Sequence, residues 1–548
     1  MGFNFSHFPD IDPSFQKKVA YFSMEFGIHQ PLKTYAGGLG FLAGSHMRSA
    51  FQLRQHVVGI GILWKYGYYD QVRKQDQTMD VLFEEKKYGF LQETGIKFTI
   101  TVSRHEVWVT ALYLAPETFN TAPVFFLTTD LPENDYLAKT ISHKLYDANP
   151  ETKIAAAILL GEGGAKLMEK INWIPDLYHL NESHALPLAF YLYNKYKDIG
   201  EVKKRLVFTN HTPEAAGNQQ TNLALLEKMS FFSEIPQTEV KAITGTEGDL
   251  LDHTLTALRL SRIANGVSKM HLHTLQQMWN GREGICDLIS ITNGQDFPYW
   301  HDPELYGSLQ NNHPEAIPGI KRRRKLELFE LIADECGEIY DPNVCTVVFA
   351  KRFAGYKRPD LFFHDMDRFE KLVTNPDRPI QIIWAGKPYP MDYADIGVFD
   401  KIVDICKRYS NCSILTGYEL KLSKLLKRGA DVWLNVPRLT HEASGTSGMS
   451  AAMNGAVNLT LPDGWIPEFA RDKINAFLVP VCDISLADHQ QDDADAASLY
   501  ELLESEVLTM YYDYPGRWLE IIKNAMTDVI PAFDSKRMAK EYYEKLYT

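Results

Sequence analysis

One stretch of the sequence, Glu442–Gly455, combines a carboxylate with a loop that could bind an anion. Glu442 is followed by small and hydroxyl-bearing residues and then by Met449–Met453, which favours a helix. Such a loop leaves backbone N–H groups unpaired at the positive end of the helix dipole. The stretch therefore predicts a phosphate-sized anion site with Glu442 beside it. An ordinary Ser/Gly turn that caps a buried helix is the alternative. The residues expected to surround the anion are Gly445, Thr446, Ser447 and Gly448.

A second candidate anion site follows the apolar run at 345–350. It places four cations within eight residues, namely Lys351, Arg352, Lys357 and Arg358. Because these side chains come directly after a predicted buried strand, we expect them to point toward a ligand rather than to line a helix. Lysine and arginine neutralise phosphate oxygens, and arginine does so in a bidentate manner. A basic surface turn is the alternative.

Polar side chains also follow apolar runs in the first half of the chain. His184, His211 and Asn293 each come shortly after a short run that suits a buried strand. Ligands bind outside the carboxyl ends of strands in open α/β sheets, so we expect these residues to line a polar cleft rim. One histidine at a strand end is more often structural, so the prediction depends on the recurrence of the pattern.

A glycine-rich turn near the N-terminus is a further candidate phosphate site. Gly37, Gly38 and Gly40 separate the apolar run at 19–24 from a helical segment around Met47. A strand, a glycine turn and a helix in succession bring backbone N–H groups close to a phosphate. The spacing does not match the dinucleotide pattern G-x-G-x-x-G, so NAD binding is not predicted. A tight strand-to-helix turn is the alternative.

The order of apolar runs and helical segments predicts two α/β domains. Residues 1–325 are expected to form a Rossmann-like sugar and acceptor domain with a β-rich insertion at about 98–130. Residues 326–480 form a Rossmann-like phosphate and donor domain, and helices in 481–548 pack back across both. Two such domains facing across a cleft are the GT-B glycosyltransferase architecture. The charge run Lys321–Lys325 is expected to begin a helix with a solvated face, or to form an interdomain strut.

The composition narrows the class of protein. The chain has 548 residues, which exceeds a single core, and its net charge is −13. This acidic balance argues against nucleic-acid binding. The six cysteines show no metal-ligand spacing and are expected to be reduced, and no metal site is predicted. No signal peptide and no apolar run of the roughly 18 residues needed to span a membrane are found, so a cytoplasmic protein without membrane contact is expected.

Together these motifs resemble the α-glucan phosphorylases, which act on glycogen, maltodextrin and starch, in their shorter prokaryotic form. The resemblance extends over nearly the whole chain. In order, the matching stretches are 20–27, 35–40, 179–184, 208–213, 291–294, 351–358, 442–449, 463–465, 498–504 and 538–543. So many ordered matches are specific for fold and ancestry.

The resemblance implies roles for individual residues. The residues matched to the substrate phosphate are Gly37, Gly38, Gly40, Arg352 and Lys357. Those matched to a cofactor phosphate are Lys351, Gly445 and Thr446. The sugar-binding matches are His184 and Asn293 at the glucosyl 6-hydroxyl, Tyr356 and Glu442 at the 2- and 3-hydroxyls, and His211 on the acceptor side. The residues expected to take part in catalysis are Glu442, His184, Arg352 and Lys357.

One position departs from the family. Where the family carries the lysine that forms a Schiff base with pyridoxal phosphate, this chain has Ser450. A hydroxyl cannot form an imine, and no lysine lies between Lys427 and Lys473. Pyridoxal phosphate is expected from the family, but not as a covalent cofactor here. The space that it leaves is suited to the second phosphate of a nucleotide sugar.

Three functions follow as alternatives. The first is a retaining hexosyltransferase that uses a nucleotide-activated sugar and an α-glucan or another saccharide acceptor. The second is an α-glucan phosphorylase that releases glucose 1-phosphate with unanchored pyridoxal phosphate. The third is a non-catalytic glucan-binding homologue, against which the retained cations argue, because a binder has no need of phosphate ligands. The family also suggests a homodimer.

Overall fold

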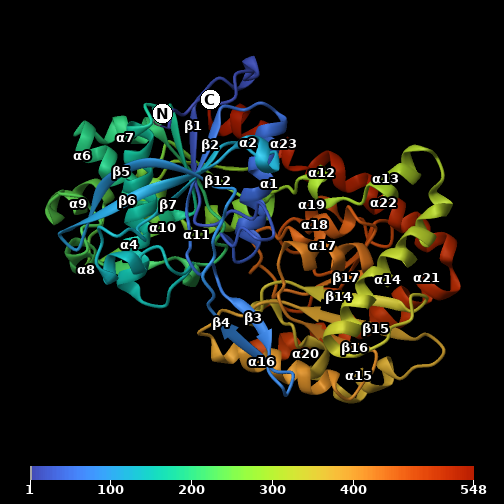
Figure 1. Cartoon of the computed structure of the whole chain (residues 1–548). Coiled ribbons are helices and arrows are strands. Elements are labelled where there is room, and N and C mark those ends of the chain that lie inside the picture. The colour runs from blue at the N-terminus through green and yellow to red at the C-terminus, as the bar shows by residue number, and fades with distance from the viewer. Residues whose placement is uncertain (1–2) are drawn as a thin grey trace. The chain divides into compact units, whose positions relative to one another are not determined.

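The computed structural model describes residues 3–548, which form two compact units. The first unit comprises the chain up to Tyr69, Phe83–Asp296 and Ser535–Thr548, and the second comprises Asp70–Leu82 and Phe297–Asp534. Each unit is built on a largely parallel sheet with helices, as Figure 1 shows. The predicted α/β class with two Rossmann-like units is thereby confirmed.

A nine-stranded sheet forms the core of the first unit. In spatial order its strands are β13 (Asp287–Ser290), β12 (Ile263–Gly266), β9 (Leu206–Thr209), β8 (Leu177–Asn181), β1 (Val19–Phe22), β2 (Val57–Ile62), β7 (Val124–Thr128), β6 (His105–Leu114) and β5 (Gln92–Val102). The strands from β13 to β7 are parallel, whereas β6 and β5 continue the sheet antiparallel. The strands at 92–128 therefore extend the main sheet, and the β-rich segment expected at about 98–130 forms an edge of that sheet. Their alternating burial pairs one core face with one solvated face, as antiparallel edges allow.

The helices of the first unit include α1, which follows the glycine-rich turn, and α23, which comes from the end of the chain. Their bounds are α1 (Gly38–Gln52), α2 (Pro116–Phe119), α3 (Tyr136–Thr140), α4 (Pro150–Ile158), α5 (Gly164–Lys170), α6 (Pro187–Tyr196), α7 (Ile199–Arg205), α8 (Leu223–Lys228), α9 (Gln237–Thr244), α10 (His253–Leu260), α11 (Lys269–Met278) and α23 (Ser535–Glu541). A short hairpin, β10 (Gln220–Asn222) with β11 (Leu250–Asp252), completes the unit.

The second unit contains a six-stranded sheet in which all neighbours are parallel. In spatial order its strands are β16 (Cys412–Leu415), β15 (Ile380–Ala385), β14 (Cys345–Ala350), β17 (Val432–Asn435), β18 (Val457–Thr460) and β19 (Ala476–Leu478). Its helices are α12 (Phe297–Trp300), α13 (Pro303–Gln310), α14 (Ile317–Cys336), α15 (Met366–Val373), α16 (Tyr393–Cys406), α17 (Leu420–Gly429), α18 (Ser447–Ala452), α19 (Ile466–Phe469), α20 (Asp488–Leu502), α21 (Leu508–Asp513) and α22 (Pro515–Phe533). The strands are short apolar runs buried on both faces, as parallel sheets require.

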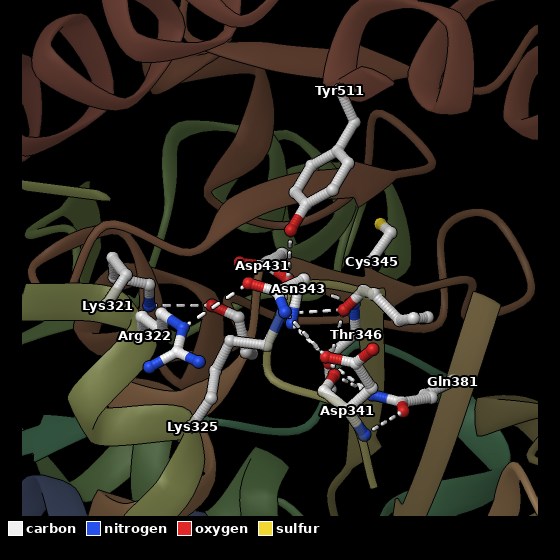
Figure 2. A network of polar contacts seen from close by, with 12 residues as sticks. Lys321, Arg322, Lys325, Asp341, Asn343, Cys345, Thr346, Gln381, Asp431 and Tyr511 are labelled. Atoms are coloured by element: carbon white, nitrogen blue, oxygen red, sulfur yellow. Dashed lines mark hydrogen bonds and ion pairs between the residues drawn. The ribbon is translucent and has the colours of Figure 1, made fainter. Parts of the chain in front are cut away.

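The charge run at the start of α14 is not simply a solvated face. Lys321 and Lys325 are buried, one turn apart, and only the residues between them reach the surface. Lys325 Nζ donates to Asp431 Oδ2 at 2.6 Å, and the same oxygen accepts the Thr346 N–H at 3.0 Å, as Figure 2 shows. Lys321 Nζ donates to three backbone carbonyls, including Asn454 O beyond α18 at 3.0 Å. These bonds fix α14 against the starts of β14 and β17.

The unit boundary lies between Asp296 and Phe297 rather than near residue 325. The chain does not divide near residue 325, because the buried Lys321 and Lys325 bond α14 to segments next to β14, β17 and β18. The C-terminal helices in 481–548 are divided between the two units. Helices α20, α21 and α22 belong to the second unit, and the last residues from Ser535 belong to the first.

A hairpin from the first half of the chain belongs to the second unit. Strands β3 (Asp70–Arg73) and β4 (Met79–Leu82), blue in Figure 1, lie beside the orange helix α16. Gln71 Nε2 donates to Gly386 O at 3.1 Å, and Gln71 Oε1 accepts the Gly417 N–H at 2.9 Å. This one side chain therefore joins the segments that follow β15 and β16. Among residues 3–548, no helix is both long and apolar enough to cross a bilayer.

Candidate active site

The strand order of the second sheet reverses between the neighbours β14 and β17. The segments that follow these strands are the four-cation stretch and the Glu442 loop, and ligands of open α/β sheets bind at such a switch point. Lys351 Nζ, after β14, donates to Asn435 Oδ1 at the end of β17. The two stretches predicted separately to bind an anion are thus brought together by topology.

The centre of this arrangement is an ion pair between Lys357 Nζ and a Glu442 carboxylate oxygen. Each of the two side chains is 11% exposed. Burial lowers the pKa of Lys357, but the carboxylate of Glu442 and the hydroxyl of Tyr356 outweigh it, so the pKa lies above its usual value. Lys357 is therefore a permanent cation near neutral pH, and its ammonium is held beside the carboxylate predicted to bind sugar.

Lys351 is a cation of a different kind. Burial, reinforced by the charge of Lys357 and opposed by Glu442, lowers the pKa of Lys351 to about 7. A bound anion would favour the charged form of this ammonium. Lys351 can therefore gain a proton when a phosphate binds, which makes anion affinity dependent on pH in the neutral range.

The loop after Glu442 presents backbone donors. Gly445 has a φ of +73°, a region in which glycine is favoured. At the start of α18, the N–H groups of Ser447, Gly448 and Met449 have no recorded acceptor among residues 3–548. A Cβ at Gly448 would lie 2.5 Å from Asn458 Oδ1, so close packing requires a glycine there.

The other residues of the four-cation stretch differ in their exposure and in their ion pairs. Arg352 is exposed, and its charge lowers the pKa of Asp395, which burial raises to about 6. Arg358 is buried and forms ion pairs with Asp492 at 3.0 Å and Asp495 at 2.8 Å. It therefore anchors α20 to the stretch and is not offered to a ligand. Tyr356 is partly buried, with its ring 4.7 Å from Lys357 Nζ.

Ser450 does not provide an anchor for pyridoxal phosphate. Its side chain is fully buried in α18, and Oγ lies 3.3 Å from the carbonyl oxygens of Thr446 and Ser447 in its own turn. The preceding lysine in the sequence, Lys427, is buried on α17 with Nζ 3.7 Å from the ring centroid of Trp300. The cations and N–H donors fit a phosphate group, but residue 450 does not fit an imine-bound cofactor.

In the first unit, His184, His211 and Asn293 follow β8, β9 and β13, as expected for a cleft rim. His211 Nε2 lies 2.8 Å from Asn181 Oδ1, which can only accept, so this nitrogen donates. The Nδ1 atom of His211 is then the one able to accept a hydrogen bond. His184 Nδ1 and Asn293 Oδ1 are buried without a hydrogen-bond partner among the described residues. All three residues thus carry polar atoms suited to hydroxyl groups.

Two histidines that the sequence did not single out belong to the same region. His271 Nδ1 accepts the Val267 N–H at 3.2 Å, and its Nε2 lies 3.1 Å from Thr212 O, next to His211. His253 lines a cavity of about 160 Å³ together with His184, Trp64 and Tyr146. Both begin helices or lie within them, so no strand-end position marked them in the sequence.

Four histidines of the first unit are held uncharged. Burial lowers the pKa of His184 to about 4 and that of His211 to about 3. Burial likewise lowers the pKa values of His253 and His271 to about 4. All four imidazoles are neutral at pH 7, so they can exchange hydrogen bonds with hydroxyl groups but cannot neutralise a phosphate.

The glycine turn before α1 already holds a carboxylate. Glu25 Oε2 accepts the N–H groups of Ala36 at 2.7 Å, Gly37 at 3.1 Å and Gly40 at 3.2 Å. Glu25 Oε1 accepts the Tyr146 hydroxyl at 2.6 Å. The expected anion geometry is therefore present, but three of its donors are engaged by the protein itself. If Gly37 and Gly40 are to contact a substrate phosphate, as the sequence predicts, their hydrogen bonds to Glu25 must first break.

Glu182, between β8 and His184, has an unusual backbone. Its φ of +68° with ψ of 169° is a combination that only glycine adopts readily. Its carboxylate accepts the His211 N–H and, at 3.3 Å, the Thr212 hydroxyl. Burial raises the pKa of Glu182 to about 7 despite these bonds. The strained residue thereby ties the segment after β8 to the segment after β9.

Comparison with known proteins gives matches to both units. Residues 298–496 match the carbohydrate phosphorylase family model, and residues 18–289 match the starch synthase catalytic domain model. An uncharacterized protein of Methanocaldococcus jannaschii is 44% identical over 97% of this chain and 100% of its own. The maltodextrin phosphorylase of Thermococcus litoralis is 33% identical over 98% of this chain and 71% of its own. The glycogen phosphorylase of Aquifex aeolicus is 30% identical over 98% and 87%, respectively.

Proposed function

The chain belongs to the α-glucan phosphorylase family and is a glycosyltransferase-type enzyme, and from this premise we propose that it transfers hexosyl groups between a phosphorylated sugar and an α-glucan without lysine-bound pyridoxal phosphate. One observation carries the proposal. Ser450 is buried and bonded to its own helix, whereas Lys351, Lys357 and Glu442 remain assembled at the switch point of the second sheet. The anion site is retained and the imine-forming amine is lost.

A nucleotide-activated sugar is the donor that this arrangement favours. Lys351, Lys357 and Arg352 provide charge for more than one phosphate, and the N–H groups at the start of α18 add donors. As the glycosidic bond to the phosphate breaks, negative charge grows on the leaving group, and fixed cations stabilise it. The match of residues 18–289 to a starch synthase catalytic domain supports this reading.

We assign the binding of the sugar to uncharged side chains and to side chains that accept hydrogen bonds. Glu442 and Tyr356 in the second unit, and His184, His211 and Asn293 in the first, are proposed to bind hydroxyl groups. The uncharged imidazoles suit this role, because a neutral ligand is bound without a desolvated charge. The cavity of about 160 Å³ beside His184 is smaller than a drug-sized site of roughly 300–1,000 Å³ and suits one sugar ring.

A second candidate function is supported by the names of the relatives. Proteins 33% and 30% identical to this chain are a maltodextrin phosphorylase and a glycogen phosphorylase. In that case inorganic phosphate would cleave the glucan and release glucose 1-phosphate, with a non-covalent anion in the cradle of the second unit. The N–H groups of Ser447, Gly448 and Met449, which have no acceptor within residues 3–548, favour such an anion equally.

A matched pair of assays separates the two functions. The purified protein is incubated with maltodextrin and UDP-, ADP- or GDP-glucose, and chain extension and nucleotide release are measured. In parallel, maltodextrin and phosphate are supplied with and without pyridoxal phosphate, and glucose 1-phosphate is measured. We expect transfer from at least one nucleotide sugar. Glucose 1-phosphate release alone would favour the phosphorylase, and glucan binding without turnover in every assay would identify a non-catalytic homologue.

A further inference from the structure

Behind the Lys357–Glu442 pair lies a second buried carboxylate, that of Asp463. Asp463 Oδ2 accepts the backbone N–H of Glu442 at 3.0 Å, and Asp463 Oδ1 accepts the Gly464 N–H at 2.8 Å. The side chain is buried, with 1% of the residue exposed. Glu442 is therefore held at two points, by Lys357 at its carboxylate and by Asp463 at its backbone.

The turn that carries Asp463 shapes the whole Glu442 loop. The Trp465 N–H donates to Ser444 O at 2.9 Å, two residues after Glu442. Gly464 has a φ of +61°, and a Cβ there would clash with Ser444 O. The ring of Trp465 also lies 3.1 Å from where a Cβ on Gly448 would be. The turn thus contacts the loop at Glu442, Ser444 and Gly448.

The proposed reaction affects the two contacts that hold Glu442 differently. A donor phosphate that reaches Lys357 competes with the Glu442 carboxylate for the same ammonium. The carboxylate must then turn to the sugar, although its peptide group must stay in place. The bond from the Glu442 N–H to Asp463 does not involve Lys357, so it survives the exchange.

We propose that Asp463 is a positioning residue that keeps the Glu442 loop in register while Lys357 transfers from Glu442 to the phosphate of the donor. This role rests on the proposed function, because it assigns Lys357 to phosphate and Glu442 to sugar. Without Asp463, no hydrogen bond from its carboxylate holds the backbone of Glu442 when the Lys357–Glu442 ion pair breaks. The loss is therefore expected in turnover rather than in donor binding.

The charges around Asp463 agree with this role. Burial, with a smaller contribution from the charge of Glu442, raises the pKa of Asp463 to about 6, although the Glu442 N–H, the Gly464 N–H and Lys357 lower it. The carboxylate is thus ionised at neutral pH and accepts both N–H groups. Glu442 and Lys357 are the charged groups that influence it.

The test compares Asp463→Ala, Asp463→Asn and a matched control, Asp472→Ala. Asp472 is an exposed aspartate of the same unit whose Oδ1 accepts the Leu478 N–H at 2.9 Å. With the nucleotide sugar found active, Asp463→Ala should lower kcat about tenfold to 100-fold, with the donor KM changed by less than about threefold. Asp463→Asn, which retains one acceptor oxygen, should be intermediate, and Asp472→Ala should match the wild type. A kcat that is unchanged, or that falls only with the folded fraction measured by circular dichroism, would overturn the proposal.

A second measurement does not depend on turnover. Hydrogen exchange of the segment 442–448 is followed by mass spectrometry, with and without sulfate as a phosphate probe. Asp463→Ala should speed exchange in this segment about tenfold or more, most clearly with sulfate present, and Asp472→Ala should not. Equal exchange in Asp463→Ala and wild type overturns the positioning role. If the wild type transfers no sugar, the proposed function fails, and exchange alone decides on Asp463.

Discussion

The candidate site residues of the two units differ in their charge at neutral pH. In the first, burial lowers the pKa values of His184, His211, His253 and His271 to about 4 or below, so four imidazoles are neutral. In the second, lysines and carboxylates meet at the switch point as charged or readily charged groups. Neutral donors and acceptors suit hydroxyl groups, and fixed cations suit phosphate. The contrast supports our proposal that the histidines of the first unit bind sugar hydroxyl groups and that the lysines of the second unit bind the activating phosphate.

The glycine turn of the first unit reinforces this contrast. Its N–H groups point at an anion, as the sequence predicts, but the anion is the carboxylate of Glu25. In the second unit, the corresponding donors at the start of α18 have no protein acceptor among the described residues. The two turns therefore have similar local geometry, but only the donors of the second are available to a ligand. The difference depends on the carboxylate of Glu25, which lies twelve residues upstream of Gly37 in the sequence.

The largest effect is expected from Lys357→Met. The substitution removes the permanent cation and leaves the Glu442 carboxylate without its partner, so kcat/KM for the phosphorylated donor should fall by about 10²–10³. Steady-state kinetics with the active donor measures the change. Lys401→Met, at a lysine 53% exposed on α16, is the matched control and should retain full activity. A loss below about tenfold would mean that phosphate charge is balanced elsewhere.

The second prediction concerns Lys351 and pH. The pKa of the free protein's Lys351 is about 7, so deprotonation competes with anion binding above that pH. Sulfate affinity, measured by isothermal titration calorimetry from about pH 6 to 9, should weaken by up to about tenfold per unit above pH 7. Lys351→Met should bind sulfate more weakly and lose this dependence. A flat wild-type profile would contradict a neutral-range cation at this position.

A smaller effect is expected from Glu182→Gln in the first unit. Burial raises the pKa of Glu182 to about 7 from an ordinary value of 4.5. Between these values the folded state holds a proton that the unfolded state has lost, so this group lowers the free energy of unfolding as pH rises, by up to about 1.4 kcal/mol per unit. The variant should gain stability relative to wild type from pH 4.5 to 7 in urea titrations. Glu227→Gln, at an exposed glutamate on α8, should show no such gain.

The smallest effect concerns the buried histidines of the first unit, which should not change their protonation between about pH 8 and 5. Nitrogen-15 NMR of labelled histidines should show His184, His211, His253 and His271 neutral from pH 8 down to about 5, because their pKa values are about 4 or below. Free imidazole in the same sample provides the reference for an unperturbed ring. Titration of any of the four above pH 6 would remove the contrast between the units.

Much of the fold could be predicted because its elements are local. Short apolar runs such as Cys345–Ala350 favour buried strands, and their alternation with helices predicts the doubly wound sheets. The boundaries could not be predicted in the same way. Lys321 and Lys325 appear in the sequence as surface charges, and only the packing of α14 places them on buried carbonyl and carboxylate oxygens.

The hairpin at Asp70–Leu82 shows the same limit. Nothing in its sequence indicates that it leaves the first unit, because the interaction is made by Gln71 with Gly386 and Gly417, more than 300 residues away in the chain. Arg358 is a similar case, because its sequence context is that of the neighbouring cations and only the fold brings Asp492 and Asp495 beside it.

The family and the α/β class can be predicted from the order of residue types along the chain, and the same order places at position 450 a serine, which cannot form an imine. Which charges are available to a ligand depends on the folded structure. Burial and neighbouring groups, which come from remote segments, neutralise the histidines, engage the glycine turn with Glu25 and pair Lys357 with Glu442. The same folding places Asp463 behind Glu442, a contact between residues 21 positions apart that no local pattern encodes.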